Sequence, residues 1–193
     1  MKYSSLNLKK VKLIMYFLQS GWKRANYLKK HKVFYEMGEN VYYHTRDIPA
    51  EPYLVKIGNN VRFAANVRMI THDIISYMIN KMPQYENGDK LPHYMGKIEI
   101  GDYVMIGANS IILYNVTIGS NVIVAAGSVV TKDIPSGVVV GGNPARIICT
   151  LDEFVEKRRR LAGDIPDKTD GIDKVIHYFW RNDIMEKEES INE

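Results

Sequence analysis

Hydrophobic and polar residues between positions 100 and 135 follow a six-residue period, which fits neither an amphipathic helix nor a simple amphipathic strand. One register of the repeat is aliphatic throughout: Ile100, Ile106, Ile112, Ile118, Val124 and Val130. A second register, four residues later, holds small or aliphatic residues: Val104, Ser110, Val116, Val122, Ser128 and Ile134. Gly, Ala, Asp, Ser or Asn stand between them, as is typical of tight turns. The pattern predicts short strands joined by tight turns, each with one aliphatic side chain pointing inward.

The same phase occurs upstream, at Ile57, Phe63 and Met69. If each coil stacks on the previous one through parallel ladder hydrogen bonds, the repeated aliphatic residues form one continuous core. Each such side chain contributes roughly 1.5 to 3 kcal/mol when it is buried. The sequence therefore predicts a parallel β-helix of hexapeptide repeats over residues 36–148.

The repeat is interrupted between His72 and Gly96, where the register is lost and Pro and Gly supply turn signals. An excursion of this length is usually either a functional loop or a disordered segment. Its aromatic residues favour a binding loop, because disordered segments are poor in aromatic side chains. We expect a loop over residues 73–96 that leaves the solenoid and contacts substrate through Tyr77, Tyr85, His93 and Tyr94.

Helices are expected on both sides of the repeats. Apolar residues spaced by three and four predict one amphipathic helix ending near Lys30: Leu8, Val11, Met15, Leu18, Trp22 and Ala25. Thr150 and Glu153 form a capping-box signature for a helix after the repeats, and a later apolar run suggests a last helix. The predicted organisation is a helical region at 1–35, a β-helix at 36–148 and a helical extension at 149–193.

Charge is concentrated at the amino end. The net charge of +4 is too small to indicate nucleic-acid binding, and we expect no such partner. Residues 1–35 nevertheless contain nine Lys or Arg and no Asp or Glu. Their helix either packs on the body with a solvated basic side or contacts an anionic membrane surface or a neighbouring subunit. The single cysteine, Cys149, suits a reducing compartment, so we expect a cytoplasmic protein that is peripheral to the membrane if that contact forms.

Two stretches resemble a known family. The segment "IGDYVMIGANSIILYNVTIGSNVIVAAGSVVTKDIPSGVVVGGNPARII" resembles the carboxyl-terminal signature of hexapeptide-repeat acyltransferases. The segment "PYLVKIGNNVRFAANVRMITHD" resembles the coil that carries the catalytic histidine in sugar O-acetyltransferases of that superfamily, including those acting on capsular polysaccharides. The resemblance implies a left-handed parallel β-helix, a homotrimer with active sites between subunits, and transfer of an acetyl group from acetyl-CoA to a sugar or glycan hydroxyl.

The resemblance also implies the site residues. It makes His72 the general base, and a sugar hydroxyl needs such a base because it is otherwise a poor nucleophile. Asp73 would orient His72 or cap a turn. A backbone N–H at position 108 would stabilise the oxyanion, and the positions matched to acetyl-CoA contacts are Ala108, Ala126, Gly127, Thr131, Lys132 and Arg146. Met105 stands where many of these enzymes carry Trp, so the wall of the acyl site differs.

The same fold also supports other functions. A zinc enzyme of the hexapeptide type needs converging histidines, whereas the five histidines here are not paired at short spacing, so no metal is expected: His31, His44, His72, His93 and His177. An acetyltransferase acting on chloramphenicol or a streptogramin, a sugar N-acetyltransferase and a non-catalytic β-helix scaffold are the alternatives. The pattern leaves open the acceptor, the choice between O- and N-acetylation, and the acyl chain length.

Overall fold

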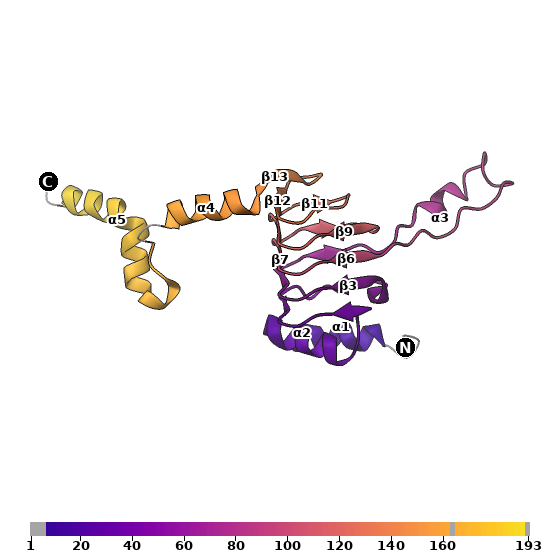
Figure 1. Ribbon diagram of the computed structural model, residues 1–193, viewed down its shortest axis with the longest axis horizontal. Helices are drawn as coiled ribbons and strands as arrows, with labels where there is room; N and C mark the ends of the chain where they lie inside the picture. The colour runs from indigo at the N-terminus through magenta and orange to yellow at the C-terminus, as the bar shows by residue number, and fades with distance from the viewer. Residues whose placement is uncertain (1–6, 163–164, 192–193) are drawn as a thin grey trace. The chain divides into compact units, whose positions relative to one another are not determined.

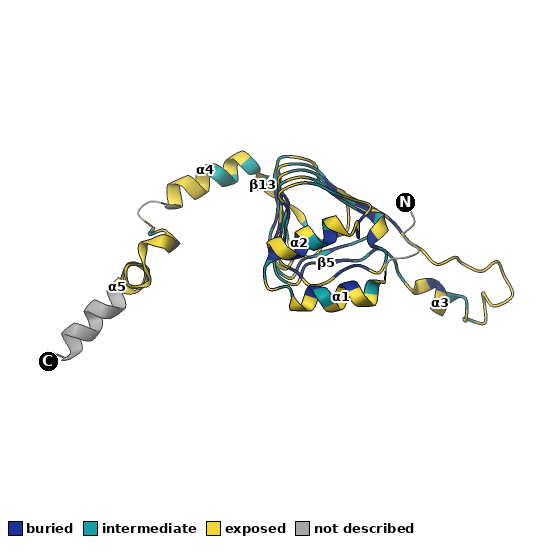
Figure 2. Ribbon diagram, turned by 90° about the horizontal axis from the view of Figure 1, so that it is seen from below, coloured by how far each residue is buried: buried dark blue, intermediate teal, exposed yellow. Residues whose placement is uncertain are grey.

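The computed structural model describes residues 7–162 and 165–191. The chain divides into two units, one up to Phe154 and one from Val155 onward. The first unit contains a stack of coils in which strands from successive coils lie directly under one another (Figure 1). Seen along the stack, the coils outline a three-sided prism (Figure 2).

Three sheets form the sides of the prism. Sheet A contains β1 (Glu36–Met37), β3 (Val55–Ile57), β6 (Ile98–Ile100) and β9 (Val116–Ile118). Sheet B contains β2 (Tyr42–Tyr43), β4 (Arg62–Phe63), β7 (Val104–Ile106), β10 (Val122–Val124), β12 (Val138–Gly141) and β13 (Arg146–Thr150). Sheet C contains β5 (Arg68–Met69), β8 (Ile111–Ile112) and β11 (Val129–Val130). Neighbouring strands are parallel except for β12 and β13, so the predicted β-helix is confirmed.

The six-residue period arises because one strand and one corner together use six residues. Ile100, Ile106 and Ile112 lie on sheets A, B and C in turn, and Ile118 returns to sheet A directly opposite Ile100. All four side chains are at most 2% exposed. Ser110 and Ser128, from the second register, are fully buried, and their hydroxyl groups donate to the Ala125 carbonyl oxygen. The core of stacked aliphatic residues is therefore the one that the repeat predicts.

Asparagine lets the chain turn the corners. Six Asn residues have a positive φ of between 55° and 60°: Asn40, Asn60, Asn66, Asn109, Asn115 and Asn121. Asn adopts this left-handed conformation more readily than other residues with a Cβ atom, because its short polar side chain bonds locally to the backbone. The corner composition thus follows from the backbone geometry that a tight coil requires.

Two helices, and not the single predicted one, lie at the N-terminal end of the prism (Figure 1). Helix α1 (Leu8–Phe17) ends because Leu18 is extended, and α2 (Gly21–Lys30) starts where the Ser20 side chain accepts a hydrogen bond from the Trp22 N–H. Trp22, assigned to the buried stripe, is 43% exposed. Arg24 is buried instead, and its guanidinium donates to the backbone carbonyls of Leu18, Tyr43 and His44. These bonds join the helices to the first coil.

The predicted loop leaves the prism after β5 and projects from the prism as a long arm (Figures 1 and 2). Its two ends pair with each other: His72 and Met95 form an antiparallel bridge, and the Gly96 N–H donates to the Thr71 carbonyl at 2.9 Å. A short helix, α3 (Ile75–Ile79), follows the departure point. After the loop, β6 resumes the stack and pairs in parallel with β3.

The segment after the repeats begins within the prism, because β13 pairs antiparallel with β12. Helix α4 (Leu151–Ala162) then starts with the predicted capping box: the Thr150 N–H donates to Glu153 at 2.8 Å and the Glu153 N–H to Thr150 at 3.2 Å. The predicted last helix is α5 (Ile172–Ile191), kinked at Trp180 and preceded by a 3-10 turn, η3 (Lys168–Asp170). In the parts of the chain that the structure describes, every helix is too short or too polar to cross a membrane.

Candidate active site

His72 lies at the corner between sheets C and A, where the loop leaves the prism. Its Nδ1 atom is 2.7 Å from Oε2 of Glu51, a residue on the same corner one coil earlier, just before the 3-10 turn η2 (Pro52–Leu54). The Thr71 hydroxyl donates to the same oxygen at 2.6 Å. The side chains of His72 and Glu51 are 29% and 15% exposed, so the pair is only partly open to solvent. The histidine is therefore held in one orientation by a partly buried carboxylate.

The protonation of this pair follows from its hydrogen bonds. Burial acts to raise the pKa of Glu51, but the hydrogen bonds from Thr71 and His72 and the nearby charges of His72 and His93 outweigh burial and hold that pKa below its ordinary value. An ionised carboxylate has no proton to donate, so the hydrogen in the bond lies on Nδ1 of His72. Nε2 of the neutral ring then has a free lone pair. This is the arrangement that a general base needs.

Asp73, expected either to orient His72 or to cap a turn, has the contacts of the second alternative. Its carboxylate accepts hydrogen bonds from the Tyr114 hydroxyl at 2.7 Å and from the Ile75 N–H at 3.1 Å, and none from the His72 ring. The Tyr114 bond, followed by the Ile75 bond, lowers the pKa of Asp73. These are the contacts of a residue that caps the turn into α3 and ties the loop to the next coil. The position that orients His72 is occupied by Glu51, which the sequence interpretation missed, and the catalytic role of Asp73 stays a prediction.

The structure brings two of the four predicted substrate residues to His72. The His93 ring lies with its centroid 4.9 Å from that of His72, and the Tyr77 ring meets His93 edge-on at 5.9 Å. Tyr94 lies at the loop base, where its hydroxyl accepts a hydrogen bond from Asn115 at 2.8 Å. Tyr85 is exposed further along the loop, and among the described residues its side chain makes no ring contact with these groups. The loop therefore builds one wall of the site with His93 and Tyr77.

The predicted acetyl-CoA contacts do not converge on His72 within one chain. Ala108, Ala126 and Gly127 lie at the corner between sheets B and C, and the Gly127 N–H donates to the Ala108 carbonyl at 2.8 Å. The remaining three lie elsewhere: Thr131 and Lys132 follow β11 on the same corner as His72, and Arg146 begins β13. The ladder from β5 through β8 to β11 puts Lys132 two coils further along the stack than Thr71, roughly 10 Å away at the usual strand spacing of about 4.8 Å. Sheet C thus separates two corners that both carry predicted site residues.

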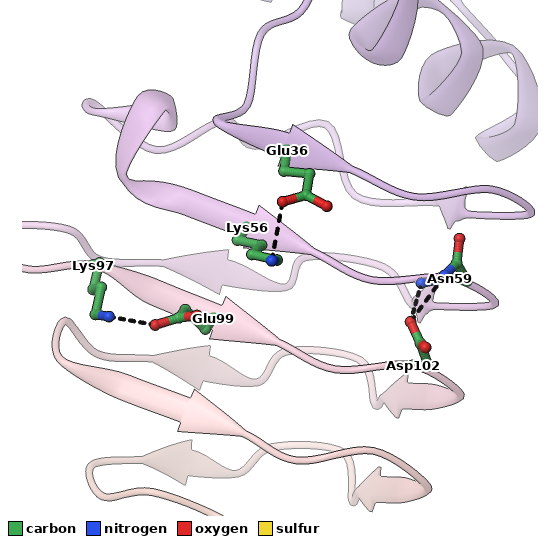
Figure 3. A network of polar contacts seen from close by, with 6 residues as sticks. All are labelled: Glu36, Lys56, Asn59, Lys97, Glu99 and Asp102. Atoms are coloured by element: carbon green, nitrogen blue, oxygen red, sulfur yellow. Dashed lines mark hydrogen bonds and ion pairs between the residues drawn. The ribbon is translucent and has the colours of Figure 1, made fainter.

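A pocket of about 450 Å³ opens on the outer face of sheet A, lined by Tyr35, Tyr53, Leu54, Lys56, Lys97 and Glu99. Figure 3 shows the ion pairs on this face: Lys56 with Glu36 at 3.0 Å and Lys97 with Glu99. The pocket adjoins the His72 corner, because Tyr53 follows Glu51 by two residues and Lys97 follows the loop. The sequence did not indicate it, since its residues come from three coils.

Among the residues whose side chains the structure describes, no group of three or more His, Cys, Asp or Glu could hold a metal ion.

Known sequences match the repeats. The family described as "Bacterial transferase hexapeptide (six repeats)" matches residues 97–132. A putative acetyltransferase, YvoF, from Bacillus subtilis (strain 168) is 39% identical over 111 residues, which are 58% of this chain and 56% of that protein. A 2,3,4,5-tetrahydropyridine-2,6-dicarboxylate N-acetyltransferase from Clostridium perfringens is 50% identical over 66 residues, 34% of this chain and 28% of that protein. The matched region therefore spans little more than half of YvoF and less of the second relative.

Solved structures match more of the chain. A maltose O-acetyltransferase from Clostridium difficile 630 has 30% sequence identity and a TM-score of 0.54, with 74% of this chain and 83% of that chain covered. A galactoside acetyltransferase in complex with coenzyme A has 28% identity and a TM-score of 0.56, with 77% of this chain and 80% of that chain covered. The coverage therefore extends well beyond residues 97–132, which the family model matches.

Proposed function

The chain belongs to the hexapeptide-repeat acyltransferase superfamily, and on that premise we propose that it transfers an acetyl group from acetyl-CoA to a hydroxyl group of a sugar or polysaccharide precursor. The observation that carries the proposal is the hydrogen bond of 2.7 Å between Glu51 and Nδ1 of His72. It leaves Nε2 of His72 free to accept a proton at the point where the loop departs. The single cysteine fits a reducing compartment, and we place the reaction in the cytoplasm.

His72 serves in both steps of the reaction, first as a base and then as an acid. Nε2 of His72 removes the proton of the acceptor hydroxyl as the oxygen attacks the thioester carbonyl and forms a new C–O bond. We assign the stabilisation of the oxyanion of the tetrahedral intermediate to a backbone N–H at Ala108 of a neighbouring subunit. The C–S bond then breaks, and the imidazolium returns its proton to the leaving sulfur of coenzyme A. Glu51 stabilises the imidazolium between these two steps.

Assembly as a homotrimer completes the site in this proposal. His72 and the group of Ala108, Ala126 and Gly127 lie on opposite corners of sheet C, so a single chain cannot surround one acetyl-CoA molecule with both. A cyclic arrangement presents one corner of each subunit to the other corner of its neighbour, and the site repeats at every interface. Lys132 and Arg146, both exposed, are suited to the phosphate groups of coenzyme A.

The pocket on sheet A supports a carbohydrate acceptor. Tyr35 and Tyr53 offer apolar ring surface with a polar end, and the Lys and Glu side chains beside them offer donors and acceptors for hydroxyl groups. N-acetylation of an amino sugar is the second candidate reaction, favoured by the match to an N-acetyltransferase. O-acetylation and N-acetylation differ in the attacking nucleophile, a hydroxyl or an amine, but both require a base to accept its proton.

The proposal is tested by thiol release from acetyl-CoA over a panel of sugars, oligosaccharides, matched amino sugars and chloramphenicol. We expect one class of hydroxyl acceptor to be acetylated, and His72→Ala to lower the rate by a factor of ~10²–10⁴. His31→Ala, which removes an exposed histidine at the C-cap of α2, serves as the matched control and should retain activity. A wild-type protein that neither binds acetyl-CoA nor turns over any acceptor would instead be a scaffold, and transfer to amines alone would identify the N-acetyltransferase.

A further inference from the structure

Helix α1 has one side that packs on the body and another that carries large, mostly exposed apolar residues. Val11 and Met15, 4% and 0% exposed, hold the helix against the protein. On the opposite side, Leu13, Tyr16 and Phe17 are 61%, 70% and 71% exposed. Together with the neighbouring lysines they form what we call the outer face of α1: Lys9, Lys10, Lys12, Leu13, Tyr16 and Phe17.

The charge of this face has one sign. Lys9, Lys10 and Lys12 are exposed, and none of them forms an ion pair within the described part of the chain. Acidic residues are absent from the sequence between positions 1 and 35. The Arg46 guanidinium adds a further positive charge, 5.9 Å from the centre of the Tyr16 ring. A binding partner for this face must therefore be anionic and must also accept apolar and aromatic side chains.

A second copy of the chain that presented the same face does not meet this requirement. Two copies that met through the same face would bring their lysines together, because such a contact is self-complementary by symmetry. An anionic phospholipid surface does meet it, since it combines phosphate groups with an apolar boundary that lies just beneath them. Tyr and Phe are also suited to the headgroup boundary, and lysine side chains extend along apolar surface while their ammonium groups stay in contact with the phosphates.

We propose that the outer face of α1 binds the surface of an anionic phospholipid membrane. Leu13, Tyr16 and Phe17 enter the boundary between headgroups and acyl chains, while Lys9, Lys10 and Lys12 contact lipid phosphates. This contact holds the protein on the membrane without any spanning segment. It does not depend on acetyl transfer, and its test requires no acceptor and no acetyl-CoA.

The test is flotation of the purified chain of 193 residues with two kinds of vesicle: phosphatidylcholine alone, and a 7:3 mixture of phosphatidylcholine and phosphatidylglycerol. The buffer contains about 0.1 M NaCl, at which exposed charges farther than about 10 Å apart are screened. We expect binding to the mixed vesicles only. Each lysine near an anionic surface is worth about 1 kcal/mol, so the triple variant K9Q/K10Q/K12Q should partition about a hundredfold less. The variant L13Q/F17Q, which keeps every charge, should partition at least tenfold less.

Two controls make the result specific to this face. The variant K81Q/K90Q/K157Q removes the same number of exposed lysines from other parts of the chain and should bind as the wild type does. Circular dichroism checks the fold of every variant, and light scattering checks its oligomeric state. The proposal is overturned if the wild type does not float with the mixed vesicles, or if it floats equally with neutral ones. It is also overturned if the control variant loses as much binding as the α1 variants. A change of oligomeric state in the α1 variants would overturn it too, because the face would then be a contact between subunits.

Discussion

Replacing Glu51 by Gln removes one charge from the candidate active site and leaves its shape almost unchanged. In the wild type the carboxylate accepts hydrogen bonds from Nδ1 of His72 at 2.7 Å and from the Thr71 hydroxyl at 2.6 Å. A Gln side chain has an amide NH₂ group that can donate to Nδ1 instead. The hydrogen of the neutral His72 ring would then lie on Nε2, where it blocks proton removal from the acceptor. The variant also has no anion to stabilise the imidazolium.

The size of the loss follows from the geometry. Two unit charges about 4 Å apart interact with about 4 kcal/mol at an effective dielectric constant of about 20. The side chains of His72 and Glu51 are 29% and 15% exposed, so solvent reduces this energy, and the Gln variant keeps a neutral hydrogen bond worth about 1 kcal/mol. We expect the net loss of transition-state stabilisation to be about 1.5 to 3 kcal/mol. Since about 1.4 kcal/mol corresponds to a factor of ten in rate, kcat should fall by about ten- to a hundredfold.

The assay is thiol release from acetyl-CoA under saturating acceptor, with kcat and KM measured separately. The loss should appear in kcat and leave the KM for acetyl-CoA near its wild-type value, because Glu51 acts through His72. Glu39→Gln is the matched control: its carboxylate is 82% exposed and pairs with Lys29, so its removal should leave both constants unchanged. If Glu51→Gln keeps the wild-type kcat, the carboxylate does not orient His72 for catalysis.

Three further predictions concern the scaffold. Ile118→Ala should lower the free energy of unfolding in denaturant titration by about 2 to 5 kcal/mol, because Ile118 is fully buried in the stacked core; a loss below about 1 kcal/mol would contradict the continuous core. Asn109 has a φ of 60°, so Asn109→Ala should be about 1 kcal/mol less stable than Asn109→Gly, and equal stabilities would show that the corner does not require this conformation. Tyr114→Phe removes a hydrogen bond to Asp73, whose pKa is lowered in the folded state. This hydrogen bond stabilises the fold fully at a pH above the ordinary pKa of Asp. Its contribution is lost as the pH falls through the lowered pKa of the folded state. The melting temperature of Tyr114→Phe should therefore lie below that of the wild type at pH 7 and approach it toward pH 3, and a constant difference would count against this account.

The coils could be predicted from the sequence because the period reflects a local rule. Each strand and corner uses six residues, so inward positions such as Ile100 and Ile118 recur at a fixed spacing that no other architecture requires. The N-terminal helices were predicted less well. The spacing of Val11, Met15 and Trp22 suits one helix, but it does not reveal that Leu18 is extended or that the guanidinium of Arg24 is buried against backbone carbonyls. Those features depend on packing against the first coil, which a helical period does not describe.

Glu51 was not predicted because it lies one coil away from His72 and not beside it in the sequence. Asp73 is its neighbour along the chain, whereas Glu51 precedes His72 by 21 residues. A signal was nevertheless present: the first coils repeat every twenty residues, as in the pairing of Glu36 with Lys56, so the residue one coil before Thr71 is Glu51. Counting by coils identifies the partner of a corner residue in a solenoid. The pocket on sheet A could be found in the same way only if the outward side chains of three coils were considered together.

The position of the loop explains how one fold can serve different acceptors. The Gly96 N–H bonds to the Thr71 carbonyl, so the two ends of the loop meet, and β6 continues the ladder of β3 as if the residues between them were absent. The cost of closing such a loop grows only slowly with its length, so the loop can change in sequence and size while Glu51 and His72 stay where the coils hold them. His93, which contacts the His72 ring, lies on the part that can change. In this protein Glu51 and His72 are therefore held by the prism, whereas the rings of His93 and Tyr77 are supplied by a segment that the prism does not constrain.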